Sequence, residues 1–278
     1  AMLLGAAKYL AETRNFGGSV AVIFQPAEEG GAGGRAMVED GMMDRFGIGQ
    51  VYGMHNMPGL PVGQFAIRPG PIMAATGEFT ITVKGKGGHA AMPHRSIDPI
   101  VVGSHIVTAL QTIASRTVDP VDSVVVTVTK FHGGDAYNVI PEQIELAGTV
   151  RTLRNEVAAT ARDRIQTICD GIAAAFGATI HVHQQANYPV TFNHFEETAF
   201  AGDIAAGVAG ESQVQRAMQP VMGAEDFSYM LEARPGAFIF IGNGDTANLH
   251  HPAYDFNDDV IAHGMSYWVR LAETALAA

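Results

Sequence analysis

The stretch at residues 20–31 reads VAVIFQPAEEGG, and it indicates both how the chain folds and where its chemistry lies. Its apolar start predicts a buried strand over residues 19–25. Two adjacent carboxylates, Glu28 and Glu29, follow this strand. Successive side chains of an extended segment point in opposite directions, so one carboxylate can bind a metal ion while the other faces the water beside it. Two neighbouring negative charges repel each other, and a bound cation would offset that repulsion.

The composition is that of a globular chain with a substantial core. Of the 278 residues, 47% are hydrophobic and 16% are charged, and this length accommodates two modest domains or one large one. The formal net charge of −11 argues against nucleic acid or an anionic membrane surface as the main partner. No apolar run is long enough to span a bilayer. Cys169 is the only cysteine, so no internal disulfide can form and the reducing cytoplasm fits best.

Both ends of the chain have the pattern of one discontinuous α/β domain, which we expect over residues 1–75 and 190–278. Alternating helices and strands favour a mixed, mainly parallel sheet. The helices are expected over residues 1–13, 33–41, 196–209 and 257–276, with a short one from Glu225 to Leu231. The strands are expected over residues 19–25, 50–55, 62–68 and 237–241.

The residues between these ends, 76–189, have a different pattern. The segment 78–84 alternates like a half-exposed strand, and residues 97–115 and 155–176 repeat apolar side chains at helical spacing. Further strands are expected over residues 123–131, 143–152 and 178–184. The order β-α-β-β-α-β is the split arrangement of ferredoxin-like domains. We therefore expect an inserted lid domain over residues 76–189.

Two histidines in short apolar or turn contexts can complete a metal site with the carboxylates. His55 follows the predicted strand near residue 52, and His250 lies beyond the strand 237–241. Open α/β sheets gather functional groups at the carboxyl ends of their strands, so these distant segments can converge. Carboxylate and imidazole ligands together suit zinc, manganese, cobalt or nickel. Water bound to such a metal loses a proton near neutral pH, and a neighbouring carboxylate can take that proton and deliver it to a leaving amine.

Six short strings carry a resemblance to a known family. They are QPAEEG (25–30), GMHN (53–56), GGHAAMPH (87–94), NVIPE (138–142), GAEDF (223–227) and LHHP (249–252). Each string is weak alone, but in this order they resemble the metal-dependent amidohydrolases that include hippurate hydrolase, aminoacylases and indole-acetyl-amino-acid hydrolases, which are related to carboxypeptidase G. The resemblance covers essentially the whole chain. It implies an α/β catalytic domain with an inserted ferredoxin-like lid through which the family often forms homodimers.

The resemblance also implies roles for individual residues. Glu28 matches the general base, and the metal ligands are Glu29, His55 and His250. His89 resembles a lid histidine that reaches the partner subunit's active site and polarises the scissile carbonyl. Asn138 and Arg151 resemble lid residues near the substrate carboxylate, where the planar fork of an arginine is chemically apt. The implied reaction is hydrolysis of N-acyl amino acids or small peptides by a metal-bound water that Glu28 activates.

One departure from the family pattern leaves alternatives open. The family places a Cys-Gly-His-Asp type of string before the helix with which this chain begins, and that string is absent, while Cys169 lies in the lid. We therefore expect the chain to lack the family's N-terminal segment, the second metal site to be incomplete, and a sheet edge to be exposed. One alternative is an inactive remnant or dimerisation module. Another is a metallo-carboxypeptidase or dipeptidase, which shares the chemistry.

Overall fold

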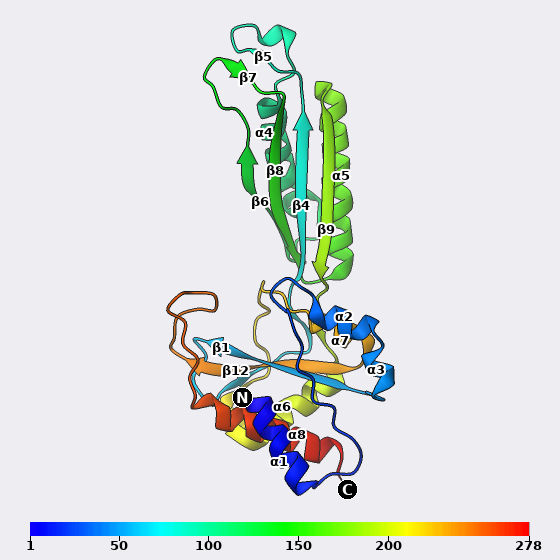
Figure 1. The fold of residues 1–278 in the computed structure, drawn as a ribbon, viewed down its shortest axis with the longest axis vertical. Coiled ribbons are helices and arrows are strands. Elements are labelled where there is room, and N and C mark those ends of the chain that lie inside the picture. The colour runs from blue at the N-terminus through cyan, green and yellow to red at the C-terminus, as the bar shows by residue number, and fades with distance from the viewer. Residues whose placement is uncertain (278) are drawn as a thin grey trace. The chain divides into compact units, whose positions relative to one another are not determined.

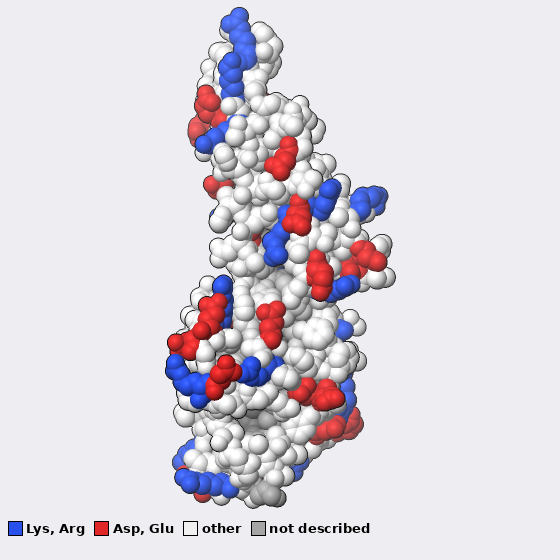
Figure 2. Space-filling view, turned by 90° about the vertical axis from the view of Figure 1, so that its right-hand side faces the viewer, with Lys and Arg blue, Asp and Glu red and all other residues white. Residues whose placement is uncertain are grey.

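A computed structural model describes residues 1–277, which form two compact units joined by chain crossings (Figure 1). The split unit comprises Ala1–Ile72, Thr191–Val221 and Glu225–Ala278. The inserted unit comprises Met73–Val190 and Met222–Ala224. On the face shown in Figure 2, acidic and basic side chains are interspersed over the surface of each unit. None of the described helices is long and apolar enough to cross a membrane.

The split unit is built on a mixed four-stranded sheet of order β1-β12-β2-β11. The long strands β1 and β12 are parallel, and β12 pairs antiparallel with β2. A separate two-stranded sheet contains β10 and β3. The strands are β1 (Val51–Pro58), β2 (Phe65–Ala66), β3 (Gly70–Met73), β10 (Thr191–Asn193), β11 (Val214–Gln215) and β12 (Gly236–Gly244). The α/β fold class with a mixed sheet is therefore confirmed.

Helices lie on both faces of this sheet, with α1, α6 and α8 on one face and α2, α3 and α7 on the other (Figure 1). A β-carbon at Gly264 would lie 1.9 Å from the sulfur of Met2, so α1 and α8 pack closely because Gly264 has no side chain. Phe65 and Tyr267, both fully buried, stack in the core. The helices are α1 (Met2–Thr13), α2 (Gly33–Glu39), α3 (Met42–Arg45), α6 (Phe195–Ala209), η3 (Glu211–Gln213), α7 (Ser228–Ala233) and α8 (Val260–Ala275).

The inserted unit has the predicted ferredoxin-like arrangement. Its four-stranded antiparallel sheet has the order β6-β8-β4-β9, and α4 and α5 cover one face of it (Figure 1). A short ribbon of β5 and β7 lies at one end. The strands are β4 (Ala75–Lys84), β5 (Gly88–His89), β6 (Val124–His132), β7 (Val139–Ile140), β8 (Gln143–Thr152) and β9 (Thr179–Tyr188). The helices are η1 (Pro93–Arg95), α4 (Pro99–Thr112), a π-helical turn η2 (Ile113–Thr117) and α5 (Asn155–Phe176).

Local sequence explains why the elements of the inserted unit form. The Asp98 side chain accepts the Ile100 N–H at 2.9 Å and caps α4, whose first residue is Pro99. α5 ends at Gly177, which adopts the left-handed conformation at φ 70°. Alternate residues of β4 face the helices and are buried in a core of aliphatic side chains. Burial of each such side chain stabilises the fold by roughly 1.5–3 kcal/mol.

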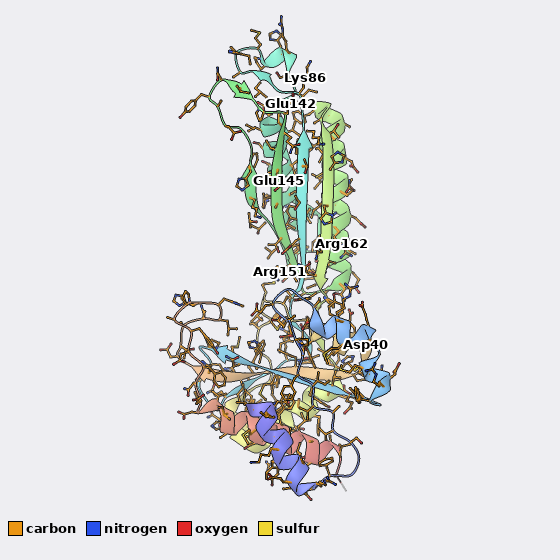
Figure 3. The ribbon with its side chains drawn as sticks, in the orientation of Figure 1. Asp40, Lys86, Glu142, Glu145, Arg151 and Arg162 are labelled. Atoms are coloured by element: carbon orange, nitrogen blue, oxygen red, sulfur yellow. The ribbon has the colours of Figure 1, made fainter. Side chains whose placement is uncertain are left out.

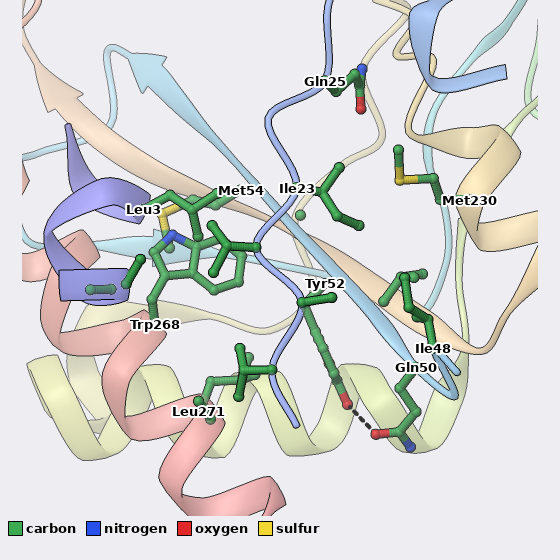
Figure 4. Close-up of a pocket in the computed structure, with 18 of the residues that line it drawn as sticks. Leu3, Ile23, Gln25, Ile48, Gln50, Tyr52, Met54, Met230, Trp268 and Leu271 are labelled. Carbon is green, nitrogen blue, oxygen red and sulfur yellow. Dashed lines mark hydrogen bonds between the residues drawn. The ribbon is translucent and has the colours of Figure 1, made fainter. Parts of the chain in front are cut away.

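The strand predicted over residues 19–25 is absent from the structure, and this prediction is wrong. The segment is irregular and partly exposed, with Phe24 62% exposed. It forms one wall of a groove of about 1400 Å³, across which lie Tyr52 and Met54 of β1 (Figure 4). Trp268 and Leu271 of α8 line the groove from the side. A strand needs a hydrogen-bonded neighbour, and the groove separates this segment from the edge of β1.

Three further predictions need correction. The strand expected over residues 62–68 is only the two-residue β2. The short helix expected from Glu225 begins at Ser228, so Glu225 precedes it. The helix expected over residues 33–41 is α2, which ends at Glu39, and the short helix α3 that follows Gly41 (φ 81°) was not predicted. The short strands β3, β5, β7, β10 and β11 were not predicted, because strands of only two to four residues carry almost no periodic signal.

Candidate acid–base and metal-binding site

The candidate site is built on the turn at residues 25–34 of the split unit. Pro26 ends the extended segment, and Ala27 reverses the chain with a left-handed φ of 54°. The N–H of Gly31 donates to the Ala27 carbonyl at 2.9 Å, and Gly30 donates to the Glu28 carbonyl at 2.6 Å. Glu28 and Glu29 therefore stand at the tip of a tight turn that leads into α2.

The two carboxylates of the turn face different surroundings. The Glu29 carboxylate lies 3.8 Å from Nδ1 of His250, and both side chains are largely exposed. Glu28 instead lines the polar end of the groove, together with His55 and Glu225. Figure 4 shows the chain segment that carries Ile23 and Gln25 passing over β1 toward this end. This divergence gives the neighbouring acids separate surroundings.

The separation of Glu29 and His250 is close to that of two ligands of one metal ion. Zinc–nitrogen and zinc–oxygen bonds of about 2.1 Å in tetrahedral geometry place two ligand atoms roughly 3.4 Å apart. His250 has a left-handed φ of 64°. Among the described residues, three of the four non-glycine residues with positive φ, namely Ala27, Ala32 and His250, lie in the two loops that form this site. Such backbone conformations gather at functional sites.

His55 is oriented so that one ring nitrogen is available. Its Nδ1 lies 2.7 Å from the carbonyl oxygen of Asn56. A carbonyl oxygen only accepts, so Nδ1 carries the proton and Nε2 keeps a lone pair. A backbone carbonyl behind a histidine is a common way to orient a metal ligand. Residues 1–277 nevertheless contain no group of three His, Cys, Asp or Glu side chains gathered closely enough to hold a metal ion. The structure thus brings Glu29 and His250 together without His55.

Burial raises the pKa values of three acidic groups of this site, and neighbouring negative charges add to the shift at Glu28 and Glu225. Burial is the main cause of the raised pKa of Glu28, and the charges of Glu29 and Asp226 add to it, while His250 opposes the shift. Burial raises the pKa of Glu225 to about 7, with the Glu28 charge adding to the shift and the Phe227 N–H opposing it. Burial also raises the pKa of Asp226, against the hydrogen bond from the Gly34 N–H. Such a cluster favours a bound cation or a retained proton.

Sequence reasoning did not identify Asp226 and Gln25 as parts of this site. The sequence allowed Glu225 and Asp226 to be simple first-turn acids of a helix. Both lie before α7 and are buried, with exposed fractions of 6% and 0%. Asp226 accepts hydrogen bonds from the turn at residues 25–34. The sequence signals were the strings QPAEEG, which contains Gln25, and GAEDF, which contains Asp226.

The other candidate residues belong to the inserted unit. His89 of β5 pairs with Val139 of β7, and the Ala90 N–H donates to the Asn138 carbonyl at 3.0 Å, so His89 and Asn138 are neighbours. Arg151 is the next-to-last residue of β8, and Figure 3 shows it at the opposite end of the inserted sheet from Lys86 and Glu142. Eight residues of strand separate Gln143 from Arg151, which corresponds to roughly 26 Å. The inserted unit does not bring Arg151 to His89.

Comparison with known proteins identifies the family. The model of peptidase family M20/M25/M40 matches residues 1–274. The hippurate hydrolase of Campylobacter jejuni is 40% identical over 97% of this chain and 70% of its own length. The N-acetyl-L-cysteine deacetylase of Bacillus subtilis is 40% identical over 94% of this chain and 62% of its own length.

A solved structure agrees with this assignment. A dinuclear metal-binding M20 peptidase of Bacillus subtilis superposes with a TM-score of 0.83 at 33% identity, covering 99% of this chain and 70% of that one. The chain thus spans 62–70% of the length of these three relatives. With an α/β unit, an inserted ferredoxin-like unit and the paired glutamates, the chain belongs to peptidase family M20/M25/M40, a family of hydrolases.

Proposed function

We propose that this chain carries the acid–base centre of a metal-dependent amidohydrolase, with Glu28 as the general base. The observation that supports the proposal best is the divergence of the two glutamates. Glu29 faces His250 at 3.8 Å, while Glu28 faces the groove. Relatives named as hydrolases of hippurate and of N-acetyl-L-cysteine support N-acyl amino acids as the substrate class.

The side chains proposed as metal ligands suit a divalent cation. Glu29, His250 and His55 offer a carboxylate and two imidazoles, which suit zinc or manganese, and also cobalt or nickel. A bound cation supplies Lewis acidity, which polarises a carbonyl and lowers the pKa of water. A complete dinuclear site needs further ligands, because no group of three gathers among residues 1–277.

In this proposal Glu28 moves the proton. Its raised pKa brings the carboxyl closer to neutrality, where proton transfer in both directions is efficient. Glu28 takes the proton of the attacking water and delivers it to the nitrogen that leaves when the amide bond breaks.

The inserted unit is proposed to contribute substrate contacts. His89, on a two-strand ribbon, would polarise the scissile carbonyl of a partner subunit's substrate, with Asn138 beside it. Arg151 would pair with the substrate carboxylate. The edge position of β6 supports a homodimer through this unit. Sedimentation equilibrium should then give twice the chain mass of 29.4 kDa, and a monomer at micromolar concentration would exclude this part of the proposal.

Localisation in the cytoplasm stays a prediction that rests on cysteine usage. Burial raises the pKa of the Cys169 thiol to about 12, so this thiol is chemically inert in the folded chain. Fractionation of the native host would test the compartment, and recovery outside the cytoplasm would refute it.

The test of the proposed base is Glu28→Gln, which keeps the shape of the side chain and removes its basicity. With manganese or zinc present, hydrolysis of hippurate should fall by about 10²- to 10⁴-fold in kcat, while metal affinity should stay within a few-fold. Full turnover by the Glu28→Gln variant would refute the assignment of Glu28 as the general base.

The main rival is a chain that keeps the fold without turnover, which the lack of a third gathered ligand favours. Turnover by the wild-type chain excludes this rival, and its absence with every metal supports it. A panel of N-acyl amino acids and dipeptides separates an amidohydrolase from a carboxypeptidase or dipeptidase.

A further inference from the structure

A buried carboxylate far away in the sequence holds both ends of the turn that carries the paired glutamates. Asp226 is fully buried, and its Oδ2 accepts the backbone N–H of Gly34 at 2.7 Å. Its Oδ1 accepts a hydrogen bond from the side-chain amide of Gln25. These two bonds bracket the segment that contains Glu28 and Glu29. The carboxylate therefore closes the turn from outside.

Two glycines, Gly33 and Gly34, allow the close approaches that hold the turn closed. A β-carbon at Gly34 would lie 3.0 Å from the carbonyl oxygen of Asp226 and 3.1 Å from its Cγ. A β-carbon at Gly33 would lie 1.8 Å from the carbonyl oxygen of Pro26. Side chains at these positions would push the two ends of the turn apart. The contact with Asp226 thus accounts for Gly34, and the contact with Pro26 accounts for Gly33, in the stretch GGAGG at residues 30–34.

The turn contains unfavourable backbone conformations that require support from the surrounding structure. Ala27 and Ala32 both adopt left-handed backbone conformations, with φ values of 54° and 50°. Residues with a β-carbon adopt this conformation at a cost, and they hold it where the surroundings impose it. The hydrogen bonds from Gln25 and Gly34 to Asp226 are such an imposed restraint.

We propose that Asp226 is a positioning residue that clamps the Gln25–Gly34 turn and thereby fixes where Glu28 and Glu29 stand. The positioning role rests on the proposed function, whereas the clamp itself does not. Asp226 bonds to both ends of the turn, and its charge also acts on Glu28. The clamp predicts that loss of the carboxylate loosens this turn first and the rest of the split unit little.

The first arm of the test is amide hydrogen exchange in the metal-free chain with Asp226→Asn. An asparagine whose oxygen accepts from Gly34 presents its amide group to Gln25, so Gln25 must turn its own amide over and lose its hydrogen bond to Glu225. The amides of Gly30, Gly31 and Gly34 should exchange about 10- to 100-fold faster, the range that corresponds to a hydrogen bond to a charged group. Amides of β12 should exchange as in the wild type.

A charge swap provides the rescue, and a second buried carboxylate provides the control. In the double variant Gln25→Glu with Asp226→Asn, the asparagine oxygen accepts from Gly34 and its amide donates to the new carboxylate, so slow exchange should return. Glu197 is 8% exposed and accepts from the Gln50 amide at 3.2 Å in the same unit. Glu197→Gln should leave exchange of the three turn amides unchanged.

The second arm measures hippurate hydrolysis with manganese. Asp226→Asn should lower kcat by at least about tenfold with KM changed less than threefold, because the reacting carboxylate is displaced while the binding surface remains. The charge swap should recover most of the lost kcat. Equal loss in Glu197→Gln would show a general structural effect and overturn the positioning role.

The two arms separate the two claims. Unchanged exchange at Gly30, Gly31 and Gly34 in Asp226→Asn overturns the clamp, whatever the activity. Faster exchange with unchanged kcat overturns the positioning role. A wild-type chain that hydrolyses no substrate with any metal refutes the proposed function and, with it, the positioning role, and the exchange data and the rescue then decide the clamp alone.

Discussion

Glu225 is a carboxyl group whose burial changes how the protein responds to pH. Its pKa rises from 4.5 to about 7 on folding, mainly because burial disfavours the charged form. The folded chain therefore binds more protons than the unfolded chain between these two values. The resulting stabilisation is fully present below about pH 4.5 and is lost as the pH rises through 7. Burial also raises the pKa of Glu28, so this carboxyl contributes a pH dependence of the same sign.

Glu225→Gln should remove this pH dependence. Glutamine keeps an oxygen that accepts the Phe227 N–H, a bond of 3.1 Å in the wild type, and it carries no charge to bury. The variant should gain stability relative to wild type as the pH rises from 5 to 8, by at most roughly 3 kcal/mol. Urea unfolding at several pH values with a chelator present measures the difference. A constant difference across this range would show that the carboxyl does not titrate as described.

The candidate site was partly predictable residue by residue. The paired glutamates and the two histidines stood out because their types and neighbours suit a metal, and the structure does bring Glu29 to His250. Their roles stay predictions. The bond between Gln25 and Asp226 joins residues 201 positions apart, and no local pattern reports such a contact.

Elements with a strong local period were predicted well, and elements that depend on a neighbour were not. The helix expected over residues 155–176 is α5, Asn155–Phe176, because its buried side chains recur at helical spacing. The apolar segment 19–25 was predicted as a strand from the same kind of evidence. This segment lies across a groove from β1 and makes no strand pairing with it. Whether a segment becomes a strand depends on a neighbouring strand as much as on its own sequence.

A glycine inside β8 gives a test at the scale of one element. Gly148 lies opposite Phe79 of β4, and a β-carbon at Gly148 would meet the Phe79 ring at 2.4 Å and the Thr127 carbonyl oxygen at 2.1 Å. Gly148→Ala should therefore destabilise the inserted unit by roughly 1–3 kcal/mol or more. Denaturant unfolding of the chain measures the change.

The matched control for this substitution lies on α5 and has the opposite sign. Gly171 is exposed in mid-helix, and a β-carbon there meets nothing within 4 Å. Gly171→Ala should stabilise the chain by about 0.5–1 kcal/mol through helix propensity. If both alanines had the same effect, the close packing of Phe79 on β8 would not explain the first result.

At the scale of the whole molecule, each unit keeps its own core. Phe79, Ile81 and Ile165 belong to the inserted core, and Phe65 and Tyr267 to the split one. The candidate acid–base and metal-binding residues lie in the split unit, where Glu28, His55 and Glu225 line a groove whose other lining is largely apolar. The chain spans 62–70% of the length of the three relatives compared above.

The measurement that tests the central claim most directly is a manganese or zinc titration of the chain, comparing His250→Asn with His251→Asn. At position 250, asparagine tolerates the left-handed backbone of the wild-type histidine. At position 251, the asparagine oxygen can accept the Ala253 N–H, which His251 Nδ1 accepts at 3.0 Å in the wild type. If Glu29 and His250 share a cation, His250→Asn should weaken binding by at least about tenfold, and His251→Asn should bind as the wild type does. Equal affinity in all three proteins, or no binding by the wild type, would contradict the account.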